Sequence, residues 1–260
     1  MFIIVIPVVS ANSDFPNRKL YPTLSYVELA KFEKMYKKVI IVDVRSKYEY
    51  DTLHIKKAIN YSRAKSDFVK NMEKLRADNK DKTIVLYCNG RTCEQSYKAG
   101  KKCWDHKIKN VIVYDGGVFE FSTANPKLAV LVGKEMGTAD KLISKTRLED
   151  HFIDFKKFVQ MIGTKNSLVI DVRDKLQRDG LALFIGKEKR AELSDRKKLD
   201  KYINEAKANN KTLLIYDNAG KQVRWLQYYL EDKRVASYYF MRGGARQYIG
   251  DLRKVFATAK

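Results

Sequence analysis

The sequence has few of the residues that mark disulfide-rich or fibrous proteins. Among 260 residues there are 3 cysteines, 4 prolines and 13 glycines. So few prolines and glycines exclude a collagen-like or low-complexity chain. Three cysteines are too few, and odd in number, for a disulfide scaffold, and the three histidines do not pair with them at zinc-ligand spacings. We therefore expect no metal and no other cofactor, which leaves thiol chemistry or ordinary buried thiols.

Long apolar runs are also lacking. No run after residue 13 approaches the roughly 18 residues that a membrane-spanning helix needs, so we expect no stable membrane insertion. Residues 1–13 are uncharged and mostly apolar and resemble a secretory signal, with cleavage near Ala11 or Ser13. The basic residues that normally precede such a run are absent, so a first strand or a misassigned start is the alternative. We expect a periplasmic or secreted protein, with a cytoplasmic one as the alternative.

Acidic residues are in the minority. Fifty-two Lys and Arg against 31 Asp and Glu give a net charge of +21, which raises nucleic acid, anionic membranes or small anions as partners. The charge is spread evenly, because residues 1–130 carry +10 and residues 131–260 carry +11. With no basic tail and no interleaving of aromatic and basic residues, we expect no nucleic-acid partner. The charge suits a solvated surface or small anionic substrates.

An internal repeat organises the chain. Three anchors recur in order: Asp43 as Asp171, Cys88 as Asp217, and Gly116-Gly117 as Gly243-Gly244. The offsets are 128, 129 and 127 residues. Three anchors that agree within two residues indicate duplication of one unit.

The repeated unit is typical of a parallel α/β domain. Its strands are short, nearly continuous apolar runs, as expected of strands buried on both faces. Residues 66–79 and 196–209 have apolar side chains at helical spacing between such strands. This alternation predicts right-handed βαβ units and a parallel sheet flanked by helices. We expect domains over residues 14–130 and 147–260, joined by a linker over 131–146, where isolated glycines interrupt the pattern.

Cys88 lies where the chemistry of such a fold is expected. Ligands bind beyond the carboxyl ends of parallel strands, and Cys88 directly follows the apolar run 84–87. A helix beginning after the next residues would aim backbone N–H groups and its dipole at the thiol, and Arg91 would favour the thiolate. Gly90 would let the loop curl inward without a Cβ clash. We therefore expect an acidic, nucleophilic Cys88, with a small buried strand-end cysteine as the alternative.

Three segments of the first repeat resemble the rhodanese family. The first segment, residues 43–60, contains Asp43-Val44-Arg45, Glu49-Tyr50, His54-Ile55 and Ala58-Ile59-Asn60. The other two are Leu86-Tyr87-Cys88 and Tyr114 to Phe121. Leu53 and Lys57 stand where that family usually has glycine. The resemblance covers almost all of residues 24–126. The second repeat, about 147–256, keeps Asp171-Val172-Arg173 and the glycine pair but lacks the His-Ile stretch.

The resemblance implies two tandem rhodanese-like domains and a sulfurtransferase of the thiosulfate sulfurtransferase type. Cys88 would take sulfane sulfur from a small anionic donor, such as thiosulfate, polysulfide or mercaptopyruvate, and hold it as a persulfide. A thiol, cyanide or a protein cysteine would accept it. Familiar two-domain members usually carry the active cysteine in the carboxyl-terminal half, and here the order is reversed. Because Asp217 cannot carry sulfur, we expect the second domain to be catalytically silent.

The resemblance also implies roles for the residues around Cys88. Arg91 would be its electrophilic catalytic partner. The expected substrate-binding residues are Asn89, Gly90, Thr92, Cys93 and Glu94, and the expected supporting residues are Asp43 and Arg45. The loop matches neither common form of the family, Cys-x-x-Gly-x-Arg or Cys-Gly-x-Gly-x-Thr, so the donor stays open.

Cys93 leaves two alternatives open. Its thiol could accept sulfur or form a disulfide with Cys88, or it could face away at the start of a helix. Cys103, beside Trp104 on a helical stretch, is expected in the core. A non-catalytic sulfur carrier or redox-responsive binding module using Cys88 and Cys93 is the main alternative function. A phosphatase of related fold would need arginine at position 94, where glutamate stands. The oligomeric state is left open.

Overall fold

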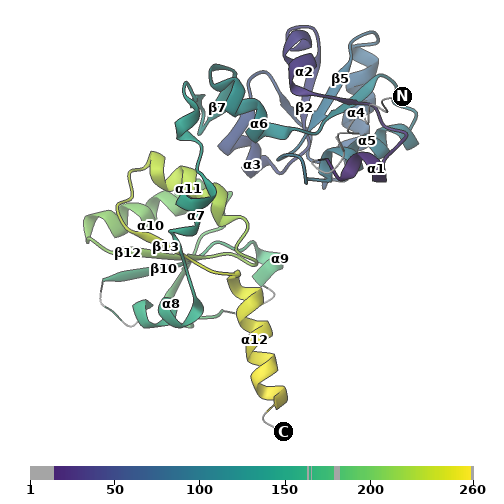
Figure 1. Ribbon diagram of the computed structural model, residues 1–260. Coiled ribbons are helices and arrows are strands. Elements are labelled where there is room, and N and C mark those ends of the chain that lie inside the picture. The colour runs from purple at the N-terminus through teal and green to yellow at the C-terminus, as the bar shows by residue number, and fades with distance from the viewer. Residues whose placement is uncertain (1–14, 163, 165, 179–181, 259–260) are drawn as a thin grey trace, which may run out of the picture. The chain divides into compact units, whose positions relative to one another are not determined.

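The computed structural model describes residues 15–162, 164, 166–178 and 182–258. The chain forms two compact units, Met1–Leu142 and Ile143–Lys260 (Figure 1). The predicted signal segment, residues 1–13, lies outside the described residues. Within the described ranges, no helix is both long enough and apolar enough to span a membrane.

A parallel five-stranded sheet of order β1-β6-β5-β2-β4 forms the centre of the first unit. Its strands are β1 (Tyr26–Val27), β2 (Ile40–Asp43), β4 (Ile59–Asn60), β5 (Ile84–Tyr87) and β6 (Val111–Tyr114). A small antiparallel sheet contains β3 (Leu53–Ile55), β7 (Ala129–Leu131) and β8 (Lys134–Glu135). The helices are α1 (Asn17–Leu20), α2 (Leu29–Met35), α3 (Lys47–Thr52), α4 (Phe68–Asp78), α5 (Gln95–Asp105) and α6 (Gly117–Ala124), with 3-10 turns η1 (Pro126–Leu128) and η2 (Ala139–Lys141).

The second unit repeats this arrangement. Its sheet has the order β9-β13-β12-β10-β11, again all parallel. Its strands are β9 (Phe152–Ile153), β10 (Ser167–Asp171), β11 (Glu188–Arg190), β12 (Thr212–Tyr216) and β13 (Tyr238–Met241). Its helices are α7 (Lys145–Glu149), α8 (Phe155–Ile162), α9 (Lys175–Arg178), α10 (Arg196–Ala208), α11 (Val223–Asp232) and α12 (Gly244–Thr258). The two sheets therefore share one strand order, and the expected α/β fold of two parallel sheets flanked by helices is confirmed.

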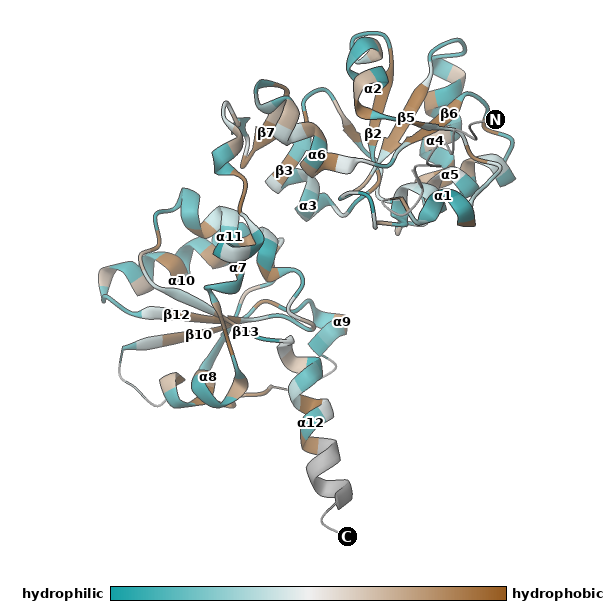
Figure 2. Ribbon diagram, viewed as in Figure 1, coloured by the Kyte–Doolittle hydropathy of each residue, from teal (hydrophilic) through white to brown (hydrophobic). Residues whose placement is uncertain are grey.

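Burial of the central strands explains why the sequence forms them. All four residues of β5 are buried, and the strands are the most hydrophobic ribbons of each unit (Figure 2). One buried cluster of the first unit joins strands β2 and β5 to helices α4 and α5 and includes Cys103, which was expected in the core. The helices predicted over 66–79 and 196–209 form as α4 and α10, each within two residues of the predicted ends.

The predicted linker carries more structure than expected. Residues 131–146 include the end of β7, all of β8 and η2. β7 pairs antiparallel with β3, with Leu53 opposite Leu131, and Met136 is fully buried. The hairpin thus belongs to the first unit, because β7 pairs with a strand of that unit and Met136 is buried in it. The division between the two units falls inside the predicted linker, between Leu142 and Ile143.

The second glycine of each repeated pair has a steric reason. Gly117 has φ +72°, and a Cβ there would lie 2.3 Å from the backbone nitrogen of Gly90. Gly244 has φ +62°, and a Cβ there would lie 2.6 Å from the carbonyl oxygen of Asp217. In both units, the helix after the glycine pair therefore packs directly against the loop that follows the central strand.

We predict that Gly117→Ala destabilises the first unit by about 2–4 kcal/mol, since it adds a backbone clash to the strain of positive φ. Gly133→Ala is the matched control, because Gly133 has φ +78° but no atom within 4 Å of an added Cβ; it should cost only about 1 kcal/mol. Hydrogen exchange of the β5 amides measures both free energies. Equal losses in the two variants would contradict the proposed contact.

Candidate active site

The parallel strands of the first unit bring three chain segments to one edge of its sheet. β5 lies between β2 and β6, and all three run in the same direction. Arg45 follows β2, Cys88 follows β5 and Asp115 follows β6. Residues 43 and 27 positions apart in the sequence therefore lie at the carboxyl ends of neighbouring strands, where open parallel sheets bind ligands.

Arg45 is buried and joins these segments. Its guanidinium donates to both carboxylate oxygens of Asp43, with a shortest distance of 2.6 Å from Nη2 to Oδ2. Nη2 also donates to the carbonyl oxygen of Leu53, at 2.5 Å, and Nη1 donates to Oδ1 of Asn89, at 3.1 Å. Such a charge is stable in the interior only because its donors are paired. The Asp-x-Arg strand end therefore positions the residue next to Cys88.

Asn89 is fixed from two sides. Its Nδ2 donates to Oε1 of Glu49, at 3.0 Å, while Arg45 holds its oxygen. Glu49 is itself held by a capping box with Ser46 at the start of α3. Both polar ends of the Asn89 side chain are thus bound within the protein. Asn89 shapes the loop in this structure, whereas the sequence predicted a substrate-binding role.

The Cys88 sulfur lies beneath the loop. The residue is 1% exposed and belongs to the buried cluster that contains Cys103. Its Sγ donates to the carbonyl oxygen of Cys93, at 3.1 Å, and lies 3.3 Å from Oγ of Ser96. Burial, and then hydrogen bonding with the Cys93 thiol, raise the pKa of Cys88 well above its ordinary value.

Cys93 is the acidic thiol of the pair. Hydrogen bonds from Cys88, and then from the backbone N–H groups of Asn89 and Gln95, lower the pKa of Cys93 to about 6. Cys93 is also the less buried of the two. The expectation of an acidic Cys88 was therefore wrong for this structure, because burial outweighs the hydrogen bonds that Ser96, at the start of α5, gives to the Cys88 sulfur. The alternative in which Cys93 faces away is also wrong, since the two thiols interact.

The other predicted loop residues have different surroundings. Arg91 pairs with Glu120, at 2.7 Å, and its guanidinium lies over the ring of Phe15, so Glu120 offsets much of the charge expected to act on the thiol. Thr92 is exposed. A Cβ at Gly90 would lie 3.5 Å from the carbonyl oxygen of Gly116, an ordinary contact. The expected steric need for glycine at position 90 was therefore wrong, and the tight position is Gly117.

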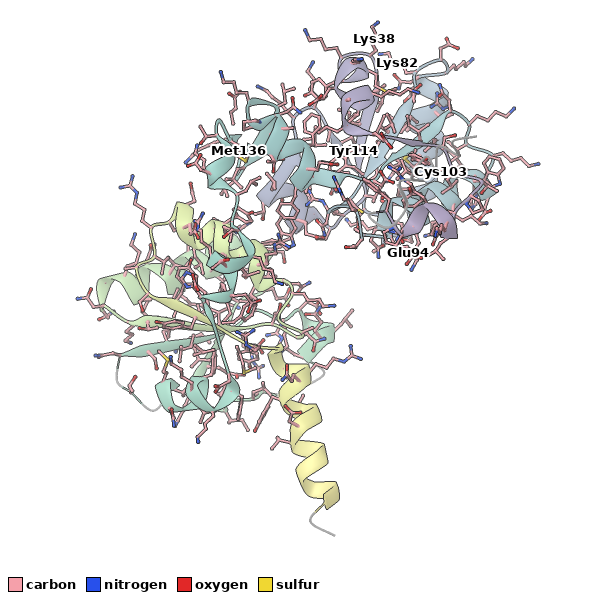
Figure 3. The ribbon with its side chains drawn as sticks, viewed as in Figure 1. Lys38, Lys82, Glu94, Cys103, Tyr114 and Met136 are labelled. Atoms are coloured by element: carbon pink, nitrogen blue, oxygen red, sulfur yellow. The ribbon has the colours of Figure 1, made fainter. Side chains whose placement is uncertain are left out.

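Glu94 lies just before α5, at the rim of the unit (Figure 3). Its carboxylate accepts a hydrogen bond from the hydroxyl of Tyr21, at 2.7 Å, and pairs with Lys98, at 2.6 Å. The sequence predicted a substrate-binding role for Glu94. These two partners hold it on the outer side of the helix start.

Sequence reasoning missed several residues that build the site. Ser96 contacts the Cys88 sulfur, and Gly117 makes the closest approach to the loop. The N–H of Val118 donates to the carbonyl oxygen of Cys88, at 2.9 Å. The Ser-x-x-Glu spacing of Ser46 and Glu49 was a readable signal of a capping box. Ser96 carried no signal, because its distance from Cys88 depends on the turn between them.

The corresponding loop of the second unit contains its own anion. Asp217, 1% exposed, follows β12 as Cys88 follows β5. Its carboxylate accepts hydrogen bonds from the backbone N–H groups of Ala219, Gly220, Gln222 and Val223. Four donors converge on one negative group, as expected at the N-terminus of a helix. Among the described residues, no group of three or more His, Cys, Asp and Glu side chains is arranged to bind a metal.

Comparisons with known proteins agree with this geometry. Residues 28–124 match the family model of the rhodanese-like domain. The tRNA uridine(34) hydroxylase of Photorhabdus laumondii is 35% identical over 85 residues, which are 32% of this chain and 23% of that protein. The protein of the same name from Yersinia enterocolitica is 31% identical over 116 residues, 43% of this chain and 29% of its own length. The chain thus spans only about a quarter of the length of these curated relatives.

Solved structures show slighter likenesses. The thiosulfate sulfurtransferase of Pseudomonas aeruginosa is 14% identical, covers 88% of this chain and 45% of that protein, and has a TM-score of 0.37. The BH2092 protein of Bacillus halodurans is 21% identical, covers 48% of this chain and 89% of that protein, and also has a TM-score of 0.37. The assignment rests on the family model, which spans the sheet from α2 to α6 and includes the Cys88 loop. The first unit therefore contains a rhodanese-like domain, over residues 28–124.

Proposed function

We propose that the protein is a sulfurtransferase that moves sulfane sulfur from a small anionic donor, through a persulfide on Cys88, to a thiophilic acceptor. The observation that carries the proposal is the position of Cys88 in a rhodanese-like domain, after β5 and against the start of α6. A thiol at the carboxyl end of a central strand is placed to form a covalent intermediate. Thiosulfate, polysulfide and mercaptopyruvate are the candidate donors.

The thiol pair supplies the nucleophile. Cys88 and Cys93 share one proton near neutral pH, since the pKa of Cys93 is lowered to about 6 while that of Cys88 is raised. As a donor approaches, the Cys88 proton passes to Cys93, and the Cys88 thiolate attacks the outer sulfur. With thiosulfate, the bond between its two sulfurs breaks and sulfite leaves with the electron pair. Cys88 then carries an anionic persulfide.

The second unit supports the idea that such a loop stabilises an anion. There, four backbone N–H groups surround the Asp217 carboxylate. The strand order and the glycine contact are the same in both units. In the first unit, we propose that the corresponding space accommodates the charge of the donor or persulfide. In the second unit, Asp217 occupies that space, so we propose that this unit is catalytically silent.

The donor and the acceptor are proposed only by class. The net charge of +21 suits small sulfur anions, and a thiol, cyanide or a protein cysteine would accept the sulfur. The curated relatives are named for tRNA uridine hydroxylation, but the match covers 23% and 29% of their lengths. The cysteine pair points to sulfur chemistry, so we base the proposal on it.

The first prediction concerns sulfur loading. After incubation with each donor, intact-protein mass spectrometry of Cys103→Ser should show transient addition of about 32 Da, one sulfur atom, as in the parent protein. Cys88→Ser should show none, because the proposal assigns the attack on the donor to Cys88 and not to Cys93 or Cys103. Cys103 is the matched control, since it is equally buried in the same cluster. Loading of Cys88→Ser would show that the nucleophile is misassigned.

The second prediction concerns thiol ionisation. Because the pKa of Cys93 is lowered to about 6, its alkylation rate should rise from pH 5 and level off above about pH 7. Burial raises the pKa of Cys103 to about 12, so Cys103 should stay unmodified over that range. Peptide mapping after brief iodoacetamide treatment measures both rates. Faster labelling of Cys88 than of Cys93 at pH 7 would contradict the assignment of charge within the pair.

The alternative function predicts different products. A non-catalytic, redox-responsive module would form a Cys88–Cys93 disulfide with an oxidant and would take sulfur from no donor.

We also propose that the protein is exported, because residues 1–13 have the composition of a secretory signal. Amino-terminal sequencing of the native protein tests this, because retention of residue 1 would contradict cleavage.

A further inference from the structure

The second thiol of the loop makes a specific reaction available after sulfur has been loaded. Cys88 and Cys93 interact directly, and Cys88 Sγ lies 3.1 Å from the carbonyl oxygen of Cys93. Both side chains pack on one buried cluster. A disulfide requires two sulfurs that can approach to about 2 Å with only small backbone movement. Packing on the same cluster places the two thiols near each other, as such a bond would need.

The two thiols differ in their burial and in the segment that holds them. Cys88 is 1% exposed and directly follows a buried strand, while Cys93 is half-buried in the turn that leads into α5. The N–H of Cys93 donates to the carbonyl oxygen of Gly90, at 2.8 Å, so a single tight turn separates the two residues. One end of the pair is thus held by the sheet, and the other lies in a short loop segment.

The second unit lacks this arrangement. The residue five positions after Asp217 is Gln222, and its backbone N–H donates to the Asp217 carboxylate, at 2.6 Å. Cys103, the remaining thiol, is buried on α5. Within the described structure, only Cys93 therefore places a second sulfur beside the proposed persulfide.

We propose that Cys93 is a resolving residue, which attacks the inner sulfur of the Cys88 persulfide and releases the outer sulfur as hydrosulfide. This rests on the proposed sulfurtransferase function. The Cys93 thiol first passes its proton to the outer sulfur of the anionic persulfide. The resulting Cys93 thiolate attacks the inner sulfur of Cys88–S–SH, a bond forms between the two Sγ atoms, and the bond to the outer sulfur breaks. The outer sulfur leaves as HS⁻ with its proton and the electron pair. The sulfane sulfur is reduced, and the two cysteines are oxidised to a disulfide.

An external dithiol completes the cycle. It reduces the Cys88–Cys93 disulfide by thiol–disulfide exchange and leaves both cysteines as thiols. The complete cycle therefore uses two substrates, a sulfane-sulfur donor and a dithiol reductant. Its product is sulfide. Because Cys93 is the more exposed of the two residues, it is the sulfur that an incoming dithiol reaches first.

The test separates loading from resolution by measuring two products without oxygen. With a slight excess of thiosulfate and no reductant, released sulfite reports loading and released sulfide reports the Cys93 step. Mercaptopyruvate, with pyruvate as the co-product, is run in parallel. The parent protein and Cys103→Ser should release about one equivalent each of co-product and sulfide and lose about 2 Da as the disulfide forms. Without donor, both should stay reduced.

Cys93→Ser should load more slowly but retain the added sulfur. It should release the co-product, release at least tenfold less sulfide and keep the mass increase of about 32 Da. Trypsin cleaves after Lys82, Arg91 and Lys98, so the disulfide of the parent protein should join peptides 83–91 and 92–98. That linked pair should be missing from Cys93→Ser.

The results distinguish failure of this inference from failure of the proposed function. If the parent protein releases co-product but holds the sulfur without releasing sulfide, Cys93 does not resolve the persulfide. Sulfide release by Cys93→Ser, or a persulfide mapped to Cys93 in the parent protein, would also overturn the inference. If neither donor yields its co-product, the proposed sulfurtransferase function fails, and the resolving step fails with it.

Discussion

A buried guanidinium joins parts of the first unit that are far apart in the sequence. Arg45 binds Asp43 at the end of β2, the carbonyl oxygen of Leu53 at the start of β3, and the side chain of Asn89 beside Cys88. A charge in the interior is stable only when its hydrogen bonds are made, and the acceptors of Arg45 come from three separate segments. The buried guanidinium is therefore stable only when those segments take this arrangement. The loop after β5 takes its position from that constraint. Arg173 forms the same pair with Asp171 in the second unit.

One position divides the two units chemically. Both place a backbone loop after the central strand, and in both a backbone N–H of the helix after the glycine pair donates to the carbonyl oxygen of that position. Asp217 fills its loop with a carboxylate that accepts hydrogen bonds from the backbone. In the first unit, Cys88 places a thiol at the same position. Burial raises the pKa of this thiol and so favours its neutral form. The same backbone can therefore serve as a closed structural unit or as a site that acquires charge only during reaction.

Burial and hydrogen bonding act in opposite directions on the thiols of the first unit. Burial disfavours the thiolate, and it dominates for Cys88. Hydrogen bonds favour the thiolate of Cys93, first from the Cys88 thiol and then from the backbone N–H groups of Asn89 and Gln95. The consequence is a division of roles between a protonated inner sulfur and an ionised outer one. This division depends on how deeply each sulfur is buried and on the contact between the two thiols, and not on the presence of two cysteines alone.

The sequence by itself determined the architecture, because buried parallel strands need continuous apolar runs and a duplicated unit repeats them at a constant offset. It also located the site, since the Asp-x-Arg strand end, Cys88 and the glycine pair all follow such runs. Only the tertiary structure decided that the hairpin of β7 and β8 belongs to the first unit, because its pairing with β3 is non-local. Only it decided that Gly117 and not Gly90 is sterically required, that Arg91 pairs with Glu120, and that Cys93 carries the charge. These features depend on distances between backbone and side-chain atoms from separate segments, which neither composition nor spacing along the chain contains.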